Sequence, residues 1–303
     1  MTVRLDGRVA IVTGAGAGLG REHALLLARL GAKVVVNDLG GGVDGTGNGN
    51  AAADKVVEEI KEAGGEAAAN YDSVASAEGA ERIVKTAQER FGGLHVLVNN
   101  AGILRDKSFA KMSMEDFNAV LQVHLLGTTY CTKAAWPVML EQEYGRIVVT
   151  TSIAGTSGNF GQANYGTAKM GMLGLMNCLA IEGRRKNVLI NAVSPGANTR
   201  MTVGLVAESI VEHMGPQQVS PAVAYLSSEL CQDSGHIITA GAGGFGRIHF
   251  FETEGVQFNP SKQISADMFA EKYGQISDLK TATPTTPGPA GRLEDRLKLL
   301  RSS

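Results

Sequence analysis

Short apolar runs alternate with longer stretches of helical periodicity along most of the chain. The segments Val9–Thr13, Lys33–Asn37 and His95–Asn99 each hold three or four aliphatic residues in a row. Continuous runs of this kind are typical of strands that are buried on both faces. Parallel strands need crossover connections, which are usually helices that cover the sheet. The pattern therefore predicts an α/β fold with a doubly wound parallel sheet.

We expect about seven strands in this sheet, with helices on both of its faces. Pro137 should bend or interrupt the longest helix, because proline cannot donate the backbone hydrogen bond of a helix interior. The expected strands are Val9–Thr13, Lys33–Asn37, Ala67–Tyr71, His95–Asn99, Gly145–Ser152, Val188–Val193 and Ile237–Ala240, and the expected helices are Arg21–Leu30, Ala51–Ala63, Glu78–Phe91, Met114–Tyr144 and Tyr165–Arg184.

Two segments do not follow either period. Residues 40–50 read GGGVDGTGNGN, which predicts a flexible loop, and residues 281–291 read TATPTTPGPAG, which is typical of a linker. We therefore expect a main domain at residues 1–246 and a C-terminal extension at 247–303, packed on that domain or trailing from it. The short amphipathic stretch Arg292–Leu300 is either a docking helix or a frayed tail.

Composition narrows the class of protein. The formal net charge is −2 and charged residues make up 19% of the chain, which favours neither a nucleic-acid partner nor a membrane surface. The three cysteines are far apart and have no metal-ligand spacing, so we expect no disulfide framework and no metal site. With no signal peptide or long apolar run, the chain is predicted to be cytoplasmic.

A glycine-rich turn follows the first strand and precedes a helix. It reads TGAGAGLG and contains Gly14, Gly18, Leu19 and Gly20. Glycines allow the backbone to turn tightly and to approach a pyrophosphate, which the helix N-terminus favours. Because the turn has this strand–turn–helix context, it predicts a dinucleotide site in a Rossmann-type fold.

Asp38 ends the second strand and predicts which dinucleotide binds. A carboxylate there accepts hydrogen bonds from both adenosine ribose hydroxyls and repels a 2′-phosphate, which favours NAD over NADP. Arg21 is the one nearby candidate for a phosphate partner, although its helix could carry it outward. The alternative is that Asp38 only caps the glycine-rich loop.

Two further strand ends add candidates for cofactor binding. Asn100, Ala101 and Gly102 follow the strand His95–Asn99, where an amide ties neighbouring strands and small residues leave room for a ribose. Asp72, followed by Ser73, ends another strand and could reach the adenine amino group. Each could also be an ordinary turn residue.

Three residues form the candidate catalytic set. Tyr165 and Lys169 are four residues apart in a helix, which places them on one face, and Ser152 precedes Tyr165 by thirteen residues at a strand end. A phenol has an ordinary pKa of about 10. A neighbouring ammonium group lowers that pKa, so tyrosine can exchange a proton with a substrate oxygen, and serine can bind that oxygen. The sequence has no serine-hydrolase elbow around Ser152.

These motifs together resemble the short-chain dehydrogenase/reductase family over roughly Leu5–Gly246. TGAGAGLG, NNAG, Ser152 and YGTAK correspond to its characteristic motifs. The resemblance implies that Ser152, Tyr165 and Lys169 are catalytic, and that Tyr165 and Lys169 also contact the cofactor. Segments such as VVVNDLGG, NNAGILRD and GNFGQANY resemble the (3R)-hydroxyacyl-CoA dehydrogenase part of peroxisomal multifunctional β-oxidation proteins. The chain is thus expected to be a standalone dehydrogenase module.

The chain departs from the family pattern at two places. His124 stands where many members have a supporting asparagine, so a proton relay through the backbone carbonyl could survive, and the imidazole is more simply a packing group. After Pro195 and Gly196, the expected threonine is shifted by one residue to Thr199. Contact of Thr199 with the nicotinamide amide is therefore an expectation from the resemblance alone.

The substrate is the least determined feature. An acyl-CoA is the first hypothesis, with Arg105, Lys107 and Lys111 as candidate rim residues for its phosphates and the apolar segment 198–215 as a cover for its chain. The alternatives are a hydroxysteroid or sterol side chain, reduction of an acyl-carrier-protein thioester, or a noncatalytic NAD(H)-binding module. The resemblance also implies a homodimer or homotetramer.

Overall fold

The computed structural model describes residues 2–197 and 213–285. Two compact units divide the chain, Met1–Arg247 and Ile248–Ser303. The predicted cover at 198–215 lies largely outside the described residues, as do Thr199, Arg292–Leu300 and the end of the linker-like segment.

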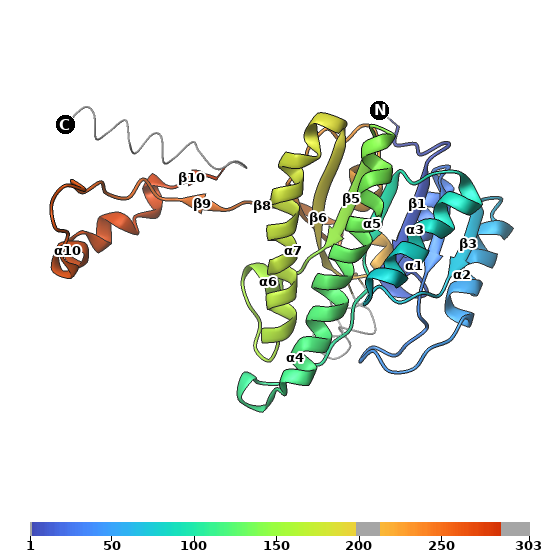
Figure 1. The fold of residues 1–303 in the computed structure, drawn as a ribbon, viewed down its shortest axis with the longest axis horizontal. Helices are drawn as coiled ribbons and strands as arrows, with labels where there is room; N and C mark the ends of the chain where they lie inside the picture. The colour runs from blue at the N-terminus through green and yellow to red at the C-terminus, as the bar shows by residue number, and fades with distance from the viewer. Residues whose placement is uncertain (1, 198–212, 286–303) are drawn as a thin grey trace. The chain divides into compact units, whose positions relative to one another are not determined.

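The first unit is built on an eight-stranded sheet, which confirms the expected α/β fold (Figure 1). The strand order is β3-β2-β1-β4-β5-β6-β7-β8, and every printed pairing from β3 to β7 is parallel. The chain reverses direction across the sheet between β1 and β4, where a crevice forms at the carboxyl ends. The strand bounds are β1 Val9–Thr13, β2 Lys33–Asn37, β3 Glu66–Asn70, β4 Val96–Asn99, β5 Gly145–Thr150, β6 Val188–Gly196, β7 Ile237–Gly241 and β8 Gly244–Ile248.

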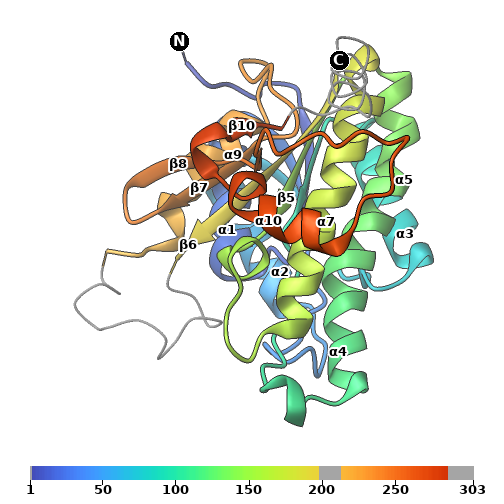
Figure 2. The same cartoon turned by 90° about the vertical axis from the view of Figure 1, so that its left-hand side faces the viewer.

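The eighth strand was not predicted. The two residues Ala242 and Gly243 connect β7 to β8 with positive φ angles of 48° and 74°, as in the tight turn of a hairpin (Figure 2). Residues 244–248 read GFGRI and are mostly exposed, so they lack the continuous apolar pattern of the buried strands. The sheet therefore ends in an edge strand that a search for buried runs does not find.

Two layers of helices cover the sheet. In one layer, α3 packs against α5, and α4 packs against α7 (Figure 1). In the other layer, α1 packs against both α2 and α9. The helix bounds are α1 Gly18–Arg29, α2 Ala51–Glu62, α3 Ala77–Phe91, α4 Met114–Leu121, α5 Gly127–Glu141, α6 Ile153–Thr156, α7 Ala163–Glu182 and α9 Ser220–Leu226.

The long helix expected at 114–144 is interrupted, but not at proline. Residues Gln122–Leu126 form a π-helical turn between α4 and α5. Pro137 lies inside α5, which continues past it, so of the expected bend or interruption at this proline the interruption is wrong. The π-turn contains His124, and such turns are frequent at functional sites.

Up to residue 285, where the description of the structure ends, the second unit holds a small two-stranded antiparallel sheet and one α-helix. Strands β9 (Phe251–Glu252) and β10 (Thr283–Pro284) pair, and α10 spans Ala266–Ile276. Ser265 caps α10 by accepting a hydrogen bond from the Met268 backbone.

Candidate functional site

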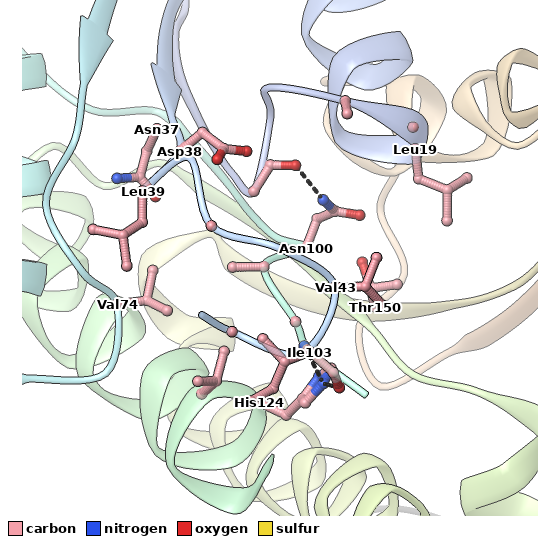
Figure 3. Close-up of a pocket in the computed structure, with 18 of the residues that line it drawn as sticks. Leu19, Asn37, Asp38, Leu39, Val43, Val74, Asn100, Ile103, His124 and Thr150 are labelled. Atoms are coloured by element: carbon pink, nitrogen blue, oxygen red, sulfur yellow. Dashed lines mark hydrogen bonds between the residues drawn. The ribbon is translucent and has the colours of Figure 1, made fainter. Parts of the chain in front are cut away.

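The carboxyl ends of the central strands surround one large pocket (Figure 3). Most of the predicted cofactor residues line it, and so do several residues that the sequence did not indicate. The predicted lining residues are Gly14, Gly18, Leu19, Asp38, Asp72, Ser73, Asn100, Ala101, Gly102, Tyr165, Lys169 and Pro195.

The glycine-rich turn leaves no space for side chains at its contacts with the rest of the site. Gly14 has a φ of +63°, and a Cβ there would lie 2.7 Å from the Cα of Ala101. Gly20 lies one turn into α1, where a Cβ would lie 2.2 Å from the carbonyl oxygen of Gly14. Gly20 thus allows the turn to fold back on the helix rather than lining the pocket.

The N-terminus of α1 is open toward a ligand. Within the described segments, no side chain caps it at Ala17, and its first turn carries no acidic residue. The uncapped N–H groups and the helix dipole favour an anion. The residues present therefore fit the pyrophosphate of a nicotinamide dinucleotide.

Asp38 lies beside this turn and holds it. Its carboxylate accepts hydrogen bonds from the backbone N–H groups of Gly16, at 2.8 Å, and Gly40, at 2.7 Å. A carboxylate has about four lone-pair sites, so two remain for ribose hydroxyls. The proposed ribose contact and the capping alternative are therefore compatible at this residue.

Arg21 does not line the pocket, and two carboxylates neutralise its charge. Its guanidinium forms ion pairs with Glu22 and Glu59. Asp72 is likewise engaged, because it accepts from Arg82 Nε at 2.6 Å and from Asn70 Nδ2 at 2.9 Å. Asp72 lines the pocket, but each of its two carboxylate oxygens already accepts one of these hydrogen bonds.

The segment after β4 forms one wall of the pocket. Thr13 Oγ1 accepts hydrogen bonds from the backbone N–H groups of Asn100, at 3.0 Å, and Ala101, at 3.1 Å. The Asn100 amide in turn donates to the carbonyl oxygens of Thr13, at 3.0 Å, and Gly14, at 3.1 Å. Figure 3 draws one of these two bonds as a dashed line from Asn100. The amide therefore ties β4 to β1, as its position at a strand end predicts.

Tyr165 and Lys169 lie together near the beginning of α7. The Lys169 ammonium is 5.3 Å from the centre of the Tyr165 ring and donates to the Thr150 carbonyl at 2.5 Å. The Ser152 side chain is close enough to Tyr165 to lower the pKa of its phenol, although Ser152 is not among the pocket-lining residues. The structure thus brings the three predicted catalytic side chains together.

Burial controls the protonation of this group. It raises the pKa of Tyr165, and the Ser152 side chain only partly opposes that increase. Burial also lowers the pKa of Lys169 to about 7. The sequence suggested that a charged lysine lowers the pKa of the tyrosine. Because burial lowers the pKa of Lys169 to about 7, this lysine is only partly charged at neutral pH.

A glycine-rich strap covers the pocket. We use this name for residues 39–49, whose two ends are joined by a hydrogen bond from Gly49 N to the Leu39 carbonyl at 2.9 Å. The strap reaches the opposite wall, where Leu104 N donates to the Val43 carbonyl at 2.9 Å and Arg105 Nε donates to the Asp44 carbonyl at 3.0 Å. The segment predicted as a loop is therefore part of the site.

Two of the three predicted rim cations, Arg105 and Lys107, form ion pairs with one carboxylate. The Asp116 carboxylate forms ion pairs with Arg105, at 3.3 Å, and with Lys107, at 3.0 Å. The hydrogen bond from Lys107 holds the pKa of Asp116 below its usual range. Because the two cations share one carboxylate, Asp116 compensates only one of their two positive charges.

The pocket includes residues that sequence reasoning missed. Their side chains carry no reactive group, so the only signal was their position just after a strand or beside a motif. Gly196 follows Pro195 at the end of β6 but does not line the pocket, and Thr199 lies outside the described residues. The missed residues are Ala17, Asn37, Leu39, Gly41, Gly42, Val43, Gly45, Val74, Ile103, Val123 and Thr150, whereas His124, which the sequence did single out, also lines the pocket.

In the described parts of the chain, none of the helices combines the length and the apolar character needed to cross a bilayer. The cytoplasmic compartment stays a prediction.

The chain matches the family model described as short chain dehydrogenase over residues 8–209. It is 52% identical to a short-chain type dehydrogenase/reductase of Mycobacterium tuberculosis, over 92% of this chain and 96% of the relative. It is 49% identical to peroxisomal multifunctional enzyme type 2 of Drosophila melanogaster, over 92% of this chain and 47% of the relative. This chain thus spans about half of the Drosophila protein.

Many solved structures are similar to this chain, and two of them are informative about the site. The full-length Drosophila multifunctional enzyme has a TM-score of 0.81 at 41% identity, over 99% of this chain and 50% of that one. A 7α-hydroxysteroid dehydrogenase, solved with NADH and 7-oxo glycochenodeoxycholic acid, has a TM-score of 0.72 at 31% identity, over 80% of this chain and 96% of that one.

Proposed function

The chain belongs to the short-chain dehydrogenase family, and from this premise we propose that it interconverts a 3-hydroxyacyl-CoA and a 3-oxoacyl-CoA with NAD. One observation carries the choice of substrate. The motif segments that resemble the (3R)-hydroxyacyl-CoA dehydrogenase part of multifunctional proteins belong to a match of 49% identity with the Drosophila enzyme, across 92% of this chain.

In this proposal Tyr165 exchanges the proton of the substrate. When the hydroxyl is oxidised, its proton passes to the Tyr165 oxygen, and in reduction Tyr165 returns a proton to the alkoxide. Ser152 holds the same oxygen and stabilises its developing charge. The bound nicotinamide supplies or accepts the hydride at the substrate carbon.

Lys169 connects Tyr165 to the surrounding protons. A pKa of about 7 lets this amine gain or lose a proton readily near neutral pH, which suits a relay. In its charged form it favours the phenolate of Tyr165 and can bind ribose hydroxyls. The Thr150 carbonyl accepts its hydrogen bond and orients it.

Two features support NAD rather than NADP. Asp38 places a carboxylate beside the glycine-rich turn, where a 2′-phosphate would be repelled. Arg21 is ion-paired with Glu22 and Glu59, so its charge is already compensated. The related 7α-hydroxysteroid dehydrogenase was solved with NADH.

The test is a matrix of substrates and cofactors with the purified protein. We expect the protein to reduce NAD when 3-hydroxyacyl-CoA thioesters are the substrates. Comparing kcat/KM across acyl chain lengths then gives the preferred chain length. Turnover of hydroxysteroids alone would overturn the acyl-CoA substrate, as would exclusive turnover of acyl-carrier-protein thioesters. NAD binding without turnover of any of these would favour the noncatalytic binding module.

The family resemblance also suggests a homodimer or homotetramer. We propose this assembly for the active protein, and light scattering at the concentration of the activity assay tests it. A monomer with full activity would contradict it.

A further inference from the structure

We propose that Gln122 is a positioning residue for the adenosine half of the cofactor, which it influences by holding the pocket wall that follows β3. We give the name adenosine wall to residues 72–75, of which Asp72, Ser73 and Val74 line the pocket. Gln122 begins the π-turn and is not among the lining residues, so it acts through this wall. The inference rests on the dinucleotide site of the function proposed above.

The order of the strands locates the adenosine half in the pocket. β1 leads into the glycine-rich turn that fits the pyrophosphate, and the catalytic side chains on α7 mark the nicotinamide end, on the side of β4 and β5. The part of the pocket left for adenosine lies on the other side of β1, at the ends of β2 and β3. There Asp38, Leu39 and Val74 line it (Figure 3), so a carboxylate is available for the ribose and two apolar side chains for the base.

Gln122 bonds directly to the end of this wall. Its Nε2 donates to the carbonyl oxygen of Ala75 at 2.6 Å, although the two residues are 47 positions apart in the chain. The N–H group of Ala75 donates to Ser73 Oγ at 3.1 Å. Both backbone polar groups of Ala75 are therefore engaged, one within the wall and the other by the π-turn.

Other contacts hold the beginning and the middle of the wall. Asn37 Nδ2 donates to the carbonyl oxygen of Asp72 at 2.9 Å. Val74 packs on the backbone of α5, since a Cβ added to Gly127 would lie 3.0 Å from its Cγ2. Gln122 fixes the far end, one residue beyond Val74. A chain without this side chain keeps the anchor at Asp72 and loses the one beside Val74, so we expect the contact with the base to weaken.

A role in folding alone and a role in positioning have different consequences. A contact that only stabilises the fold lowers Tm and leaves the affinity of the folded protein for the cofactor unchanged. A contact that positions the wall lowers the affinity for every ligand with an adenosine half, and by the same factor. It leaves the chemical step unchanged, because Tyr165 and Lys169 lie toward the other end of the pocket.

The test compares replacements that differ in whether residue 122 can donate to Ala75. Gln122→Met keeps the length of the side chain and removes the donor. Gln122→Asn keeps the amide group, which is one methylene too short to make the same contact. Gln122→Lys supplies an N–H donor again, at the end of a flexible side chain.

A second glutamine provides the matched control. Gln142 directly follows α5, and its Nε2 donates to the carbonyl oxygen of Leu94 at 2.7 Å. Leu94 precedes β4 at the amino ends of the strands, and neither residue lines the pocket. Gln142→Met therefore removes the same kind of hydrogen bond away from the cofactor. We expect it to lower Tm without changing the affinity for NADH.

Binding is measured with two ligands that share the adenosine half. Fluorescence titration gives the Kd for NADH, and displacement of NADH by AMP gives the Kd for AMP. We expect Gln122→Met and Gln122→Asn to raise both Kd values by the same factor, about threefold to tenfold, as the loss of one hydrogen bond predicts. Gln122→Lys should stay within about twofold of wild type for both ligands. At saturating NAD, kcat should stay within about twofold of wild type in all three variants.

The outcomes separate the inference from the proposed function. Wild-type Kd values in Gln122→Met and Gln122→Asn would overturn the inference, and so would a higher Kd for NADH without a higher Kd for AMP. An equal rise in Gln142→Met, or a rise in Gln122→Lys as large as in Gln122→Met, would overturn it as well. If the wild-type protein binds neither NADH nor AMP, the inference and the proposed function are both wrong. If it binds both ligands but turns over no acyl-CoA thioester, only the proposed substrate is wrong, and the binding results still decide the inference.

Discussion

Replacing Lys169 by methionine should stabilise the protein while abolishing turnover. Burial lowers the pKa of Lys169 from 10.5 to about 7. Each pKa unit corresponds to about 1.4 kcal/mol, so at pH 7 and below the folded state loses about 4 to 5 kcal/mol relative to a solvated lysine. Methionine has a similar length and carries no charge, so it avoids this cost.

The replacement also removes one favourable contact. The Thr150 carbonyl loses the hydrogen bond that Lys169 donates at 2.5 Å, which costs about 1 to 2 kcal/mol. The net gain at pH 6.5 is then about 3 kcal/mol. For a domain of this size, that corresponds to a Tm increase of about 5 to 10 °C.

The dependence on pH distinguishes this effect from general repacking. The unfolded chain binds the lysine proton with a pKa near 10.5 and the folded chain with a pKa of about 7. Between these values the unfolded state holds more protons, so the stability of the wild type rises with pH. The gain in the free energy of unfolding that Lys169→Met gives over wild type should therefore be largest below pH 7 and decrease steadily above pH 7.

Thermal unfolding of wild type and Lys169→Met between pH 6 and pH 9 measures the effect. Lys85→Met is the matched control, because Lys85 is exposed on α3 and its replacement should change stability by less than about 0.5 kcal/mol. A Tm for Lys169→Met at or below that of wild type at pH 6.5, or a gain that does not change with pH, would refute the reasoning.

Three further predictions concern the site directly. Tyr165→Phe should lower kcat about 100-fold to 10,000-fold while fluorescence titration shows unchanged NADH affinity, and wild-type turnover would remove Tyr165 from the proton step. Asp38→Ala should lower the ratio of kcat/KM for NAD over NADP at least about tenfold, and an unchanged ratio would mean that Asp38 only caps the loop. Arg105→Ala should speed NADH release in stopped-flow fluorescence, because Arg105 holds the strap at Asp44, whereas Lys107→Ala, which loses only its contact with Asp116, should match wild type. Equal release rates in both variants would contradict a role of the strap in retaining the cofactor.

The sequence predicted the elements whose signal lies in continuous burial. The parallel strands were found because their apolar runs are buried on both sides, as in Val9–Thr13. The edge strand Gly244–Ile248 was missed because it is exposed and rich in glycine. The sequence analysis expected the long helix to be interrupted at Pro137, whereas the interruption lies at Gln122–Leu126. A π-turn has no strong sequence signature, so its position was not predicted.

The site shows a similar division. Residue type and spacing predicted Ser152, Tyr165 and Lys169 as a catalytic set, and the structure places the three side chains near one another. The strap was recognised only as a loop, because its carbonyl groups at Val43 and Asp44 make the contacts and backbone atoms carry no residue signature. Burial shifts the pKa values of Tyr165 and Lys169, and neighbours distant in sequence create that burial.

The π-turn also changes the angular phase of the helix that contains it. An α-helix advances about 100° per residue, so a turn that is one residue wider shifts every later side chain around the axis. The segment before it packs against α7, whereas the segment after it packs mainly against α3. Deleting one residue from Gln122–Leu126 would restore a regular period and direct one of these two apolar faces away from its neighbour. The extra residue of the π-turn is therefore needed for the segment α4 to pack against α7 while the segment α5 packs against α3.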